Sequence, residues 1–302
     1  MTLKITTQLP PITYKEPESI KSMLAYSAAS AAGYSAVSNF LSCPEKSRLQ
    51  KMGVKSVDDV LMADKDYVDE LNALEYGTLI HALRAIRFAS SHDVMMGILE
   101  RYKLELLPSD YEAARMLMLV YESCWPRNLD PFEILGVEAE VISDIGHGEL
   151  RSVRYDTVIR YPLTKEIFSF EAKTAARGGA SGLSPYFPQG MSQTTIWNKN
   201  PHLVAQYGEM RGSFFEQFVK TNTPSIARLG PYYWTKRHQM LASNYLVAPG
   251  RTVVFYAEPE GNAPRQLHSC WGRFRACEYM PLCHEQEFGS YRFSDGRKYV
   301  GE

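Results

Sequence analysis

The stretch VRYDTVIRYPLTKEIFSFEAKT, residues 153–174, decides the fold of this 302-residue chain. Two runs rich in β-branched and aromatic residues flank a turn at Pro162, a pattern typical of neighbouring strands. A third run of this kind, residues 136–145, precedes them, so the sequence predicts three successive strands in a meander. Asp156 lies in the middle of the second strand, and Glu171 lies near the end of the third.

The acidic residues of these strands form a candidate catalytic centre. Side chains alternate along a strand, so Glu171 and Lys173 point to the same face, and neighbouring strands lie only ~4.8 Å apart. Asp156 can therefore sit beside Glu171, and the two carboxylates can share a hard divalent cation such as Mg²⁺ or Mn²⁺. A metal-bound water is a good nucleophile at neutral pH, and Lys173 can orient it or help to deprotonate it. Asp156, Glu171 and Lys173 are thus the predicted catalytic residues.

The same pattern also has a purely structural interpretation. A Glu-x-Lys pair on a strand usually belongs to a solvated face, where charged side chains pair across strands. Asp156 favours the catalytic interpretation, because burying a single carboxylate in an apolar, aromatic strand is costly. The occurrence of both features in adjacent strands strengthens the case for a metal site.

The rest of the chain alternates helical and irregular patterns around this sheet. Residues 1–20 carry three prolines and little periodicity, which predicts an irregular arm. Helical patterning then runs in pieces to about residue 125, and its strongest piece is LEYGTLIHALRAIRFASS, residues 74–91. A loop rich in Gly, Ser, Pro and Gln follows at residues 174–193. Two helical stretches come next, at residues 200–220 and 234–247, and one further strand at residues 251–259.

This order of elements indicates an α+β fold, with helices flanking a central mixed β-sheet. After the irregular arm, we expect one domain over residues 21–302. This domain consists of a helical region (residues 21–130), the catalytic sheet core (131–260) and a cysteine-rich tail (261–302) that closes on Cys43.

Three motifs resemble those of the RecB-like nucleases of the PD-(D/E)xK superfamily. GTLIHALRA, with Gly77, resembles their Gly-xxx-His motif, and RYDTVIR resembles their GxxD strand. FEAKT resembles their D-x-K strand, with Glu171 in place of the more common Asp. The resemblance implies a restriction-endonuclease-like fold, in which the metal ligands and the catalytic lysine are His81, Asp156, Glu171 and Lys173.

Two parts of the family pattern stay open in this sequence. Glu138 or Glu140, on the first strand, is a candidate for a further acidic ligand, and both project from the same face. The family also carries a downstream Gln-xxx-Tyr helix, for which this chain has no clean match. Gln206, and Gln239 with Tyr245, are imperfect substitutes.

The cysteines point to a second metal centre. Cys270, Cys277 and Cys283 are clustered and Cys43 is distant from them, and clustered thiolates are typical of zinc or iron–sulfur sites. Buried free thiols are the alternative. The motifs S-x-F-x-x-C-P and C-E-Y-x-P-x-C resemble those of iron–sulfur RecB-like nucleases, namely the AddB, exonuclease V and CRISPR-adaptation types. The resemblance implies a 4Fe–4S cluster on these four cysteines, with Zn²⁺ as the rival, whereas Cys124 is expected to pack as a small hydrophobe.

Contacts with nucleic acid must come from local patches. The net charge is −1 and the sequence pI about 6.7, so a basic field over the whole protein is absent. We expect the loop over residues 174–193 to cover the active site. The candidate DNA contacts are Arg84, Arg177, Gln206, Lys236, Arg237, Gln239 and Tyr245.

These features together predict a metal-dependent DNA exonuclease that acts on single strands or duplex ends. The length suits an enzyme of phage or mobile-element DNA recombination or degradation, working alone or beside a separate helicase, annealing or single-strand-binding protein. An endonuclease for restriction or end trimming is one alternative, and a catalytically silent DNA-binding or assembly protein with a zinc or iron–sulfur site is another. No signal peptide or membrane-spanning run is evident, so we expect a cytoplasmic protein without a membrane partner.

Overall fold

A computed structural model of the chain describes residues 4–25, 49, 54–56, 71, 73–146, 148–175, 188–220, 224–243 and 291–293. The chain divides into two compact units, which are Met1–Ser30 with Tyr67–Ser243, and Ala31–Asp66 with Asn244–Glu302. In the second unit, the short strands β1 (Val54–Ser56) and β7 (Tyr291–Phe293) pair in antiparallel fashion.

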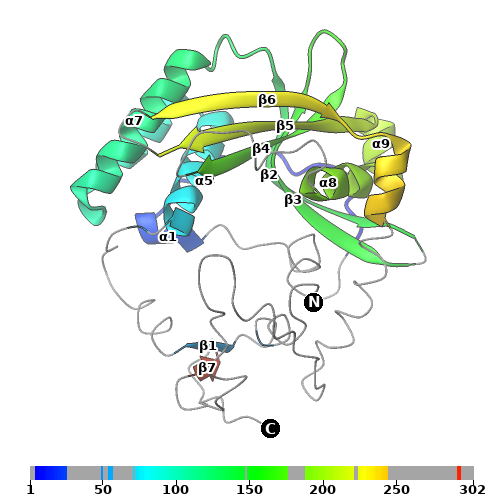
Figure 1. The fold of residues 1–302 in the computed structure, drawn as a ribbon, viewed down its shortest axis with the longest axis horizontal. Helices are drawn as coiled ribbons and strands as arrows, with labels where there is room; N and C mark the ends of the chain where they lie inside the picture. The colour runs from blue at the N-terminus through cyan, green and yellow to red at the C-terminus, as the bar shows by residue number, and fades with distance from the viewer. Residues whose placement is uncertain are drawn as a thin grey trace. The chain divides into compact units, whose positions relative to one another are not determined.

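The first unit is built on a five-stranded sheet in the order β2-β3-β4-β5-β6 (Figure 1). Neighbouring strands are antiparallel except for β4 and β5, which are parallel. The strands are β2 (Glu133–Asp144), β3 (Leu150–Arg160), β4 (Ile167–Ala175), β5 (Met210–Val219) and β6 (Ser225–Tyr233). The predicted α+β fold with a mixed sheet is therefore confirmed, and its first three strands form the expected meander.

Helices cover the two faces of this sheet. On β4, Phe170 and Ala172 pack into the main hydrophobic core with helices α5, α6 and α7, while Glu171 between them points towards α8. The helices of this unit are α1 (Ile20–Ala25), α5 (Ala73–Ala89), α6 (His92–Arg101), α7 (Pro108–Cys124), α8 (Pro188–Asn198) and α9 (Pro201–Tyr207). None of the helices in the described ranges is both long and apolar enough to span a membrane.

The helix predicted over residues 200–220 is wrong in its second half. Helix α9 ends at Gly208, whose φ of 99° is favoured by glycine, and β5 follows. β5 is a central strand that is buried along almost its whole length. A strand covered on both faces carries a nearly continuous apolar run instead of an alternation, so its period does not separate it from a buried helix.

Three other stretches complete the comparison with the sequence prediction. Strand β6 was not predicted from the sequence; it is an edge strand whose residues are mostly exposed. Of the helix predicted at 234–247, residues 236–243 are described and are helical, whereas the strand predicted at 251–259 lies outside the described residues. The loop predicted at 174–193 gives way to α8 from Pro188 onwards, since proline is well suited to the first turn of a helix.

The N-terminal arm, residues 4–19, has no regular helix or strand and runs beside β2, the edge strand of the sheet. The Thr6 backbone N–H donates to the Ile142 carbonyl at 2.9 Å, and the Ile142 N–H donates to Thr6 Oγ1 at 2.9 Å. Asn200, before α9, donates from its side-chain amide to the Thr6 carbonyl at 2.8 Å. These bonds hold the arm against the edge of the sheet that carries Glu138.

Candidate active site

Two carboxylates meet where β3 and β4 separate. The paired register of these strands ends at Val158 and Ser169. Continuing that register by two residues places Asp156 opposite Glu171. At this point a side-chain acceptor replaces the backbone–backbone hydrogen bonds between the two strands, because the Ala172 backbone N–H donates to Asp156 Oδ2 at 2.8 Å. The two acids predicted from the sequence therefore lie side by side on adjacent strands.

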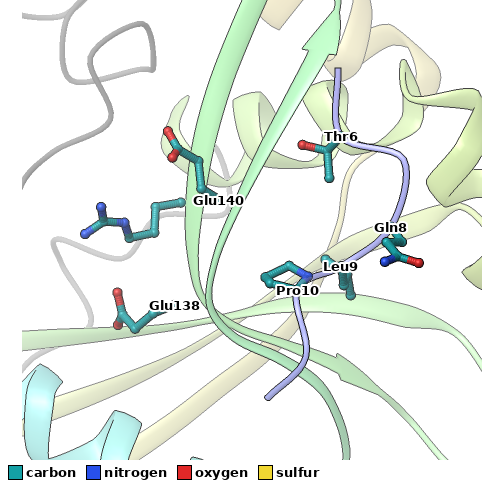
Figure 2. Close-up of a pocket in the computed structure, with 7 residues that line it drawn as sticks. Thr6, Gln8, Leu9, Pro10, Glu138 and Glu140 are labelled. Carbon is teal, nitrogen blue, oxygen red and sulfur yellow. The ribbon is translucent and has the colours of Figure 1, made fainter. Parts of the chain in front are cut away.

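Glu138 extends the pair to a row of three acids. The β2–β3 pairs on either side of it place Glu138 opposite Asp156. Its φ of 48° lies in the left-handed region, which residues other than glycine rarely adopt. Glu138 is half-buried within reach of the charges of Asp156 and Glu171, whereas Glu140 is exposed, and Figure 2 shows Glu138 nearer to α5. Of the two glutamates that the sequence left open as a further ligand, Glu138 is the one that lies beside the other acids.

His81 reaches the row of acids from α5. Its Nδ1 lies 3.4 Å from Asp156 Oδ2. Burial lowers the pKa of His81, and the Lys173 and Arg84 charges lower it further against the opposing effect of Asp156. Gly77, one turn earlier, permits this approach, since a Cβ there would lie 2.6 Å from Thr174 Oγ1. The Gly-xxx-His spacing thus corresponds to the close approach of α5 to β4.

Gln189, at the start of α8, links the acid and the lysine of β4. Lys173 Nζ donates to Gln189 Oε1 at 3.0 Å, and Gln189 Nε2 donates to Glu171 Oε2 at 3.1 Å. One amide therefore fixes the relative positions of both side chains. Sequence reasoning placed Gln189 in a loop covering the active site and gave it no role. Within the described end of that stretch, Gln189 bonds to Glu171, while residues 176–187 lie outside the described residues.

The three acids differ in their readiness to ionise. Burial and the Asp156 charge together raise the pKa of Glu171 to about 8, against the opposing effect of Lys173. Burial and repulsion from Asp156 and Glu171 likewise raise the pKa of Glu138 to about 8. Burial also opposes ionisation of Asp156, but His81, Lys173 and other donors outweigh it and hold its pKa below the usual value. The cluster therefore holds more acidic groups than its own cations keep ionised at neutral pH.

A divalent cation fits this cluster by charge and by donor type. Glu171 Oε1 is buried and makes no hydrogen bond of good geometry among the residues described, although the buried Gln193 side chain is near enough to lower the Glu171 pKa. Carboxylate oxygens are the ligands that Mg²⁺ and Mn²⁺ prefer. As the side chains stand, no three His, Cys, Asp or Glu residues in the described ranges are grouped to hold a metal ion. The fit therefore rests on the buried Glu171 oxygen and on the surplus of acidic groups, and ligation requires the carboxylates to lose their protons and draw together.

We expect Mg²⁺ to stabilise the protein more at about pH 9 than at about pH 6. Near pH 6 the cation must displace protons from Glu138 and Glu171, whose pKa values are about 8, whereas near pH 9 both are ionised. Without metal, the folded state binds more protons than the unfolded chain between pH 4.5 and 8, so the free energy of unfolding falls as pH rises through that window. Thermal unfolding with and without Mg²⁺ at both pH values measures this.

The matched variants for that measurement lie on the same sheet. Glu171→Gln removes the buried carboxylate and is expected to abolish the Mg²⁺-dependent shift of the unfolding midpoint. Glu140→Gln makes the same change at an exposed position of β2 and should leave the shift intact. Equal shifts in the two variants would place the cation elsewhere.

Arg84, predicted as a DNA contact, is buried in the core, which makes this prediction wrong. Its Nε donates to Glu216 at 2.6 Å, its Nη1 to Thr157 Oγ1 at 2.9 Å and its Nη2 to the Phe170 carbonyl at 3.2 Å. Only 1% of the side chain is exposed. Thr157 follows Asp156 on β3, and Phe170 precedes Glu171 on β4. Arg84 therefore connects β3 and β4 directly behind the acids.

The other predicted contacts divide into three groups. Gln206, Lys236 and Arg237 are exposed and remain candidates for nucleic-acid contact. The Gln239 side chain instead donates to the Trp234 carbonyl at 3.0 Å and accepts from Asn198 at 3.1 Å, so it serves the protein's own packing. Arg177, Tyr245 and the four predicted cluster ligands lie outside the described residues, and those ligands are Cys43, Cys270, Cys277 and Cys283.

Cys124 was expected to pack as a small hydrophobe, and this is wrong. It is a free, exposed thiol at the last residue of α7. The last buried residue of that helix is Tyr121, one turn before Cys124. Hydrophobicity alone does not tell how far along a helix the core extends.

Comparisons with known proteins leave the chain without an assigned family. No family model matches it, and no curated protein matches its sequence. A solved structure from Eubacterium rectale, described as a candidate exonuclease, aligns over 68% of this chain and 75% of its own, with 11% identity and a TM-score of 0.43. A likeness this distant assigns neither a function nor a superfamily to this chain.

Proposed function

We propose that this protein is a metal-dependent deoxyribonuclease of the RecB-like kind. The observation that carries the proposal is the row of Glu138, Asp156 and Glu171 across three adjacent strands, with Lys173 bonded into it through Gln189. Surplus buried carboxylates with an ammonium group alongside are suited to binding a divalent cation next to a negatively charged phosphate.

In this proposal, Glu138, Asp156 and Glu171 hold Mg²⁺ or Mn²⁺ together with His81. When bound, the cation offsets negative charge on the phosphodiester and favours ionisation of a water. Lys173 orients that water and stabilises the developing charge, and Gln189 keeps the ammonium group directed at Glu171. His81 holds Asp156 in place from the side of α5.

We further propose that the enzyme is an exonuclease that acts on single-stranded DNA or duplex ends. In this proposal it works in the reducing cytoplasm, beside a separate DNA-processing protein. Incubation with Mg²⁺ or Mn²⁺ and matched linear and covalently closed circular DNA tests this. Degradation of linear DNA alone is the expected result. Cutting of the closed circles would assign an endonuclease instead, and stable binding without cleavage would assign a silent DNA-binding protein.

We also propose that Cys43, Cys270, Cys277 and Cys283 hold a 4Fe–4S cluster. In support, β1 follows Cys43 in the chain and pairs with β7, which follows Cys283, so the two distant segments belong to one compact unit. Metal bonds that close so long a loop restrain the unfolded chain. The purified protein should be brown and contain iron and acid-labile sulfide, and Cys283→Ala should lower its stability. A colourless protein loaded with zinc would contradict the cluster.

A further inference from the structure

A cavity beside the acids is not used by the proposed chemistry. It has a volume of about 540 Å³ and lies between residues 13–18 of the arm and helix α5; we name it the arm pocket. One wall is a stripe of small side chains on α5, to which Met23 and Val137 add apolar surface. The arm contributes Tyr14 and Pro17 together with polar and charged side chains. The residues that matter here are Ala82, Ala85, Ala89, Tyr14, Met23 and Val137.

The arm pocket is continuous with the row of acids. Glu138 belongs to the row and also lines the pocket. Ala82 directly follows His81 on α5, and Ala85 and Ala89 continue the same helix face away from the site. An occupant of the pocket therefore lies next to the group that reacts at the acids.

The size and chemistry of the arm pocket select the occupant. A volume of 540 Å³ is in the range of small-molecule sites and is far too small for a duplex. Its charged residues are mostly acidic, and Glu16 pairs with Arg101, so the pocket does not attract a phosphate chain. Its apolar walls and the Tyr14 ring suit the flat face of a base, which is a sequence-tolerant partner for aromatic side chains.

We propose that the arm pocket holds one unpaired nucleobase adjacent to the scissile phosphate of a single-stranded DNA substrate. The inference rests on the proposed nuclease function and adds a base-binding subsite to it. The small side chains of α5 provide the space, and the arm provides the opposite wall. A duplex end must then open by at least one base pair before its strand can be cut.

The test is a binding cycle with two ligands and two proteins. Binding of a short oligothymidylate and of an abasic oligomer of equal length is measured by fluorescence anisotropy with Ca²⁺ in place of Mg²⁺. Ala85→Trp fills the arm pocket, so we expect it to weaken oligothymidylate binding by about 5- to 150-fold, the range that one stacked base supplies. Binding of the abasic oligomer should change little.

Two further variants make the outcome decisive. Met116→Trp adds a comparable bulk at an exposed position of α7 and should bind both ligands like the parent protein. Tyr14→Ala removes a wall from the arm side and should weaken base-dependent binding even if Ala85→Trp does not fold. If both pocket variants still bind the oligothymidylate more tightly than the abasic oligomer by the same factor as the parent protein, the base-binding subsite is overturned. Absence of cleavage by the parent protein with Mg²⁺ or Mn²⁺ overturns the nuclease proposal instead, whatever the binding cycle gives.

Discussion

Lys173→Met is expected to lower the rate of metal-dependent DNA cleavage by about 10²- to 10⁴-fold, the range for a group that handles a proton or charge in the transition state. The substitution keeps the aliphatic stem and removes only the ammonium group, which donates to Gln189 beside Glu171. DNA binding and the unfolding midpoint should stay close to those of the parent protein. Single-turnover cleavage of labelled DNA, with anisotropy and thermal unfolding alongside, measures all three.

Two companion variants calibrate that result. Lys199→Met removes an exposed lysine just after α8 and should cleave DNA at the parent rate. Gln189→Ala removes the amide that positions Lys173 but keeps the ammonium group, so a loss of about 10- to 150-fold is expected, the worth of one hydrogen bond to a charged group. Cleavage by Lys173→Met within twofold of the parent rate would remove Lys173 from the chemistry.

Glu216→Gln is expected to lower the free energy of unfolding by about 3–5 kcal/mol, the typical cost of breaking a buried ion pair. The Glu216 side chain is fully buried and accepts from Arg84 at 2.6 Å, from Arg228 at 2.8 Å and from the Tyr121 hydroxyl at 2.8 Å. Removing its charge leaves two guanidinium groups in the core without their shared partner. Urea denaturation of both proteins at one pH measures the difference.

An exposed ion pair of the same sheet serves as the control. Glu133 accepts from Arg160 at 2.9 Å between β2 and β3, but 51% of the Glu133 side chain is exposed. Glu133→Gln should therefore cost no more than about 1 kcal/mol. A similar small loss for Glu216→Gln would mean that the core readily accommodates the two arginines without it.

Several elements could be predicted from the sequence because they depend on local patterns. Runs of β-branched and aromatic residues on either side of Pro162 identified β3 and β4, and the helical period around His81 identified α5. The position of Arg84 one turn after Ile80 and one before Phe88 was a missed signal, since both neighbours are buried. An arginine on a helix is usually taken as a surface residue, which led to the wrong DNA contact.

Other features depend on partners that are distant in the chain. β5 is a strand because it lies parallel to β4 between two covered faces, and its own nearly continuous apolar pattern does not distinguish it from a buried helix. Gln189 gained its contacts only when α8 packed beside the acids. Local composition had suggested a loop there.

The sequence by itself determined that Glu171 and Lys173 share one face and that Asp156 lies on a neighbouring strand, because strand alternation is a property of the backbone. Only the tertiary structure decided that Glu138, not Glu140, joins them, since that choice depends on the β2–β3 register and on a left-handed backbone at one residue. It also decided that Arg84 faces Glu216 in the core. Charge alone does not reveal burial, because a buried arginine is stable only where folding supplies its acceptor.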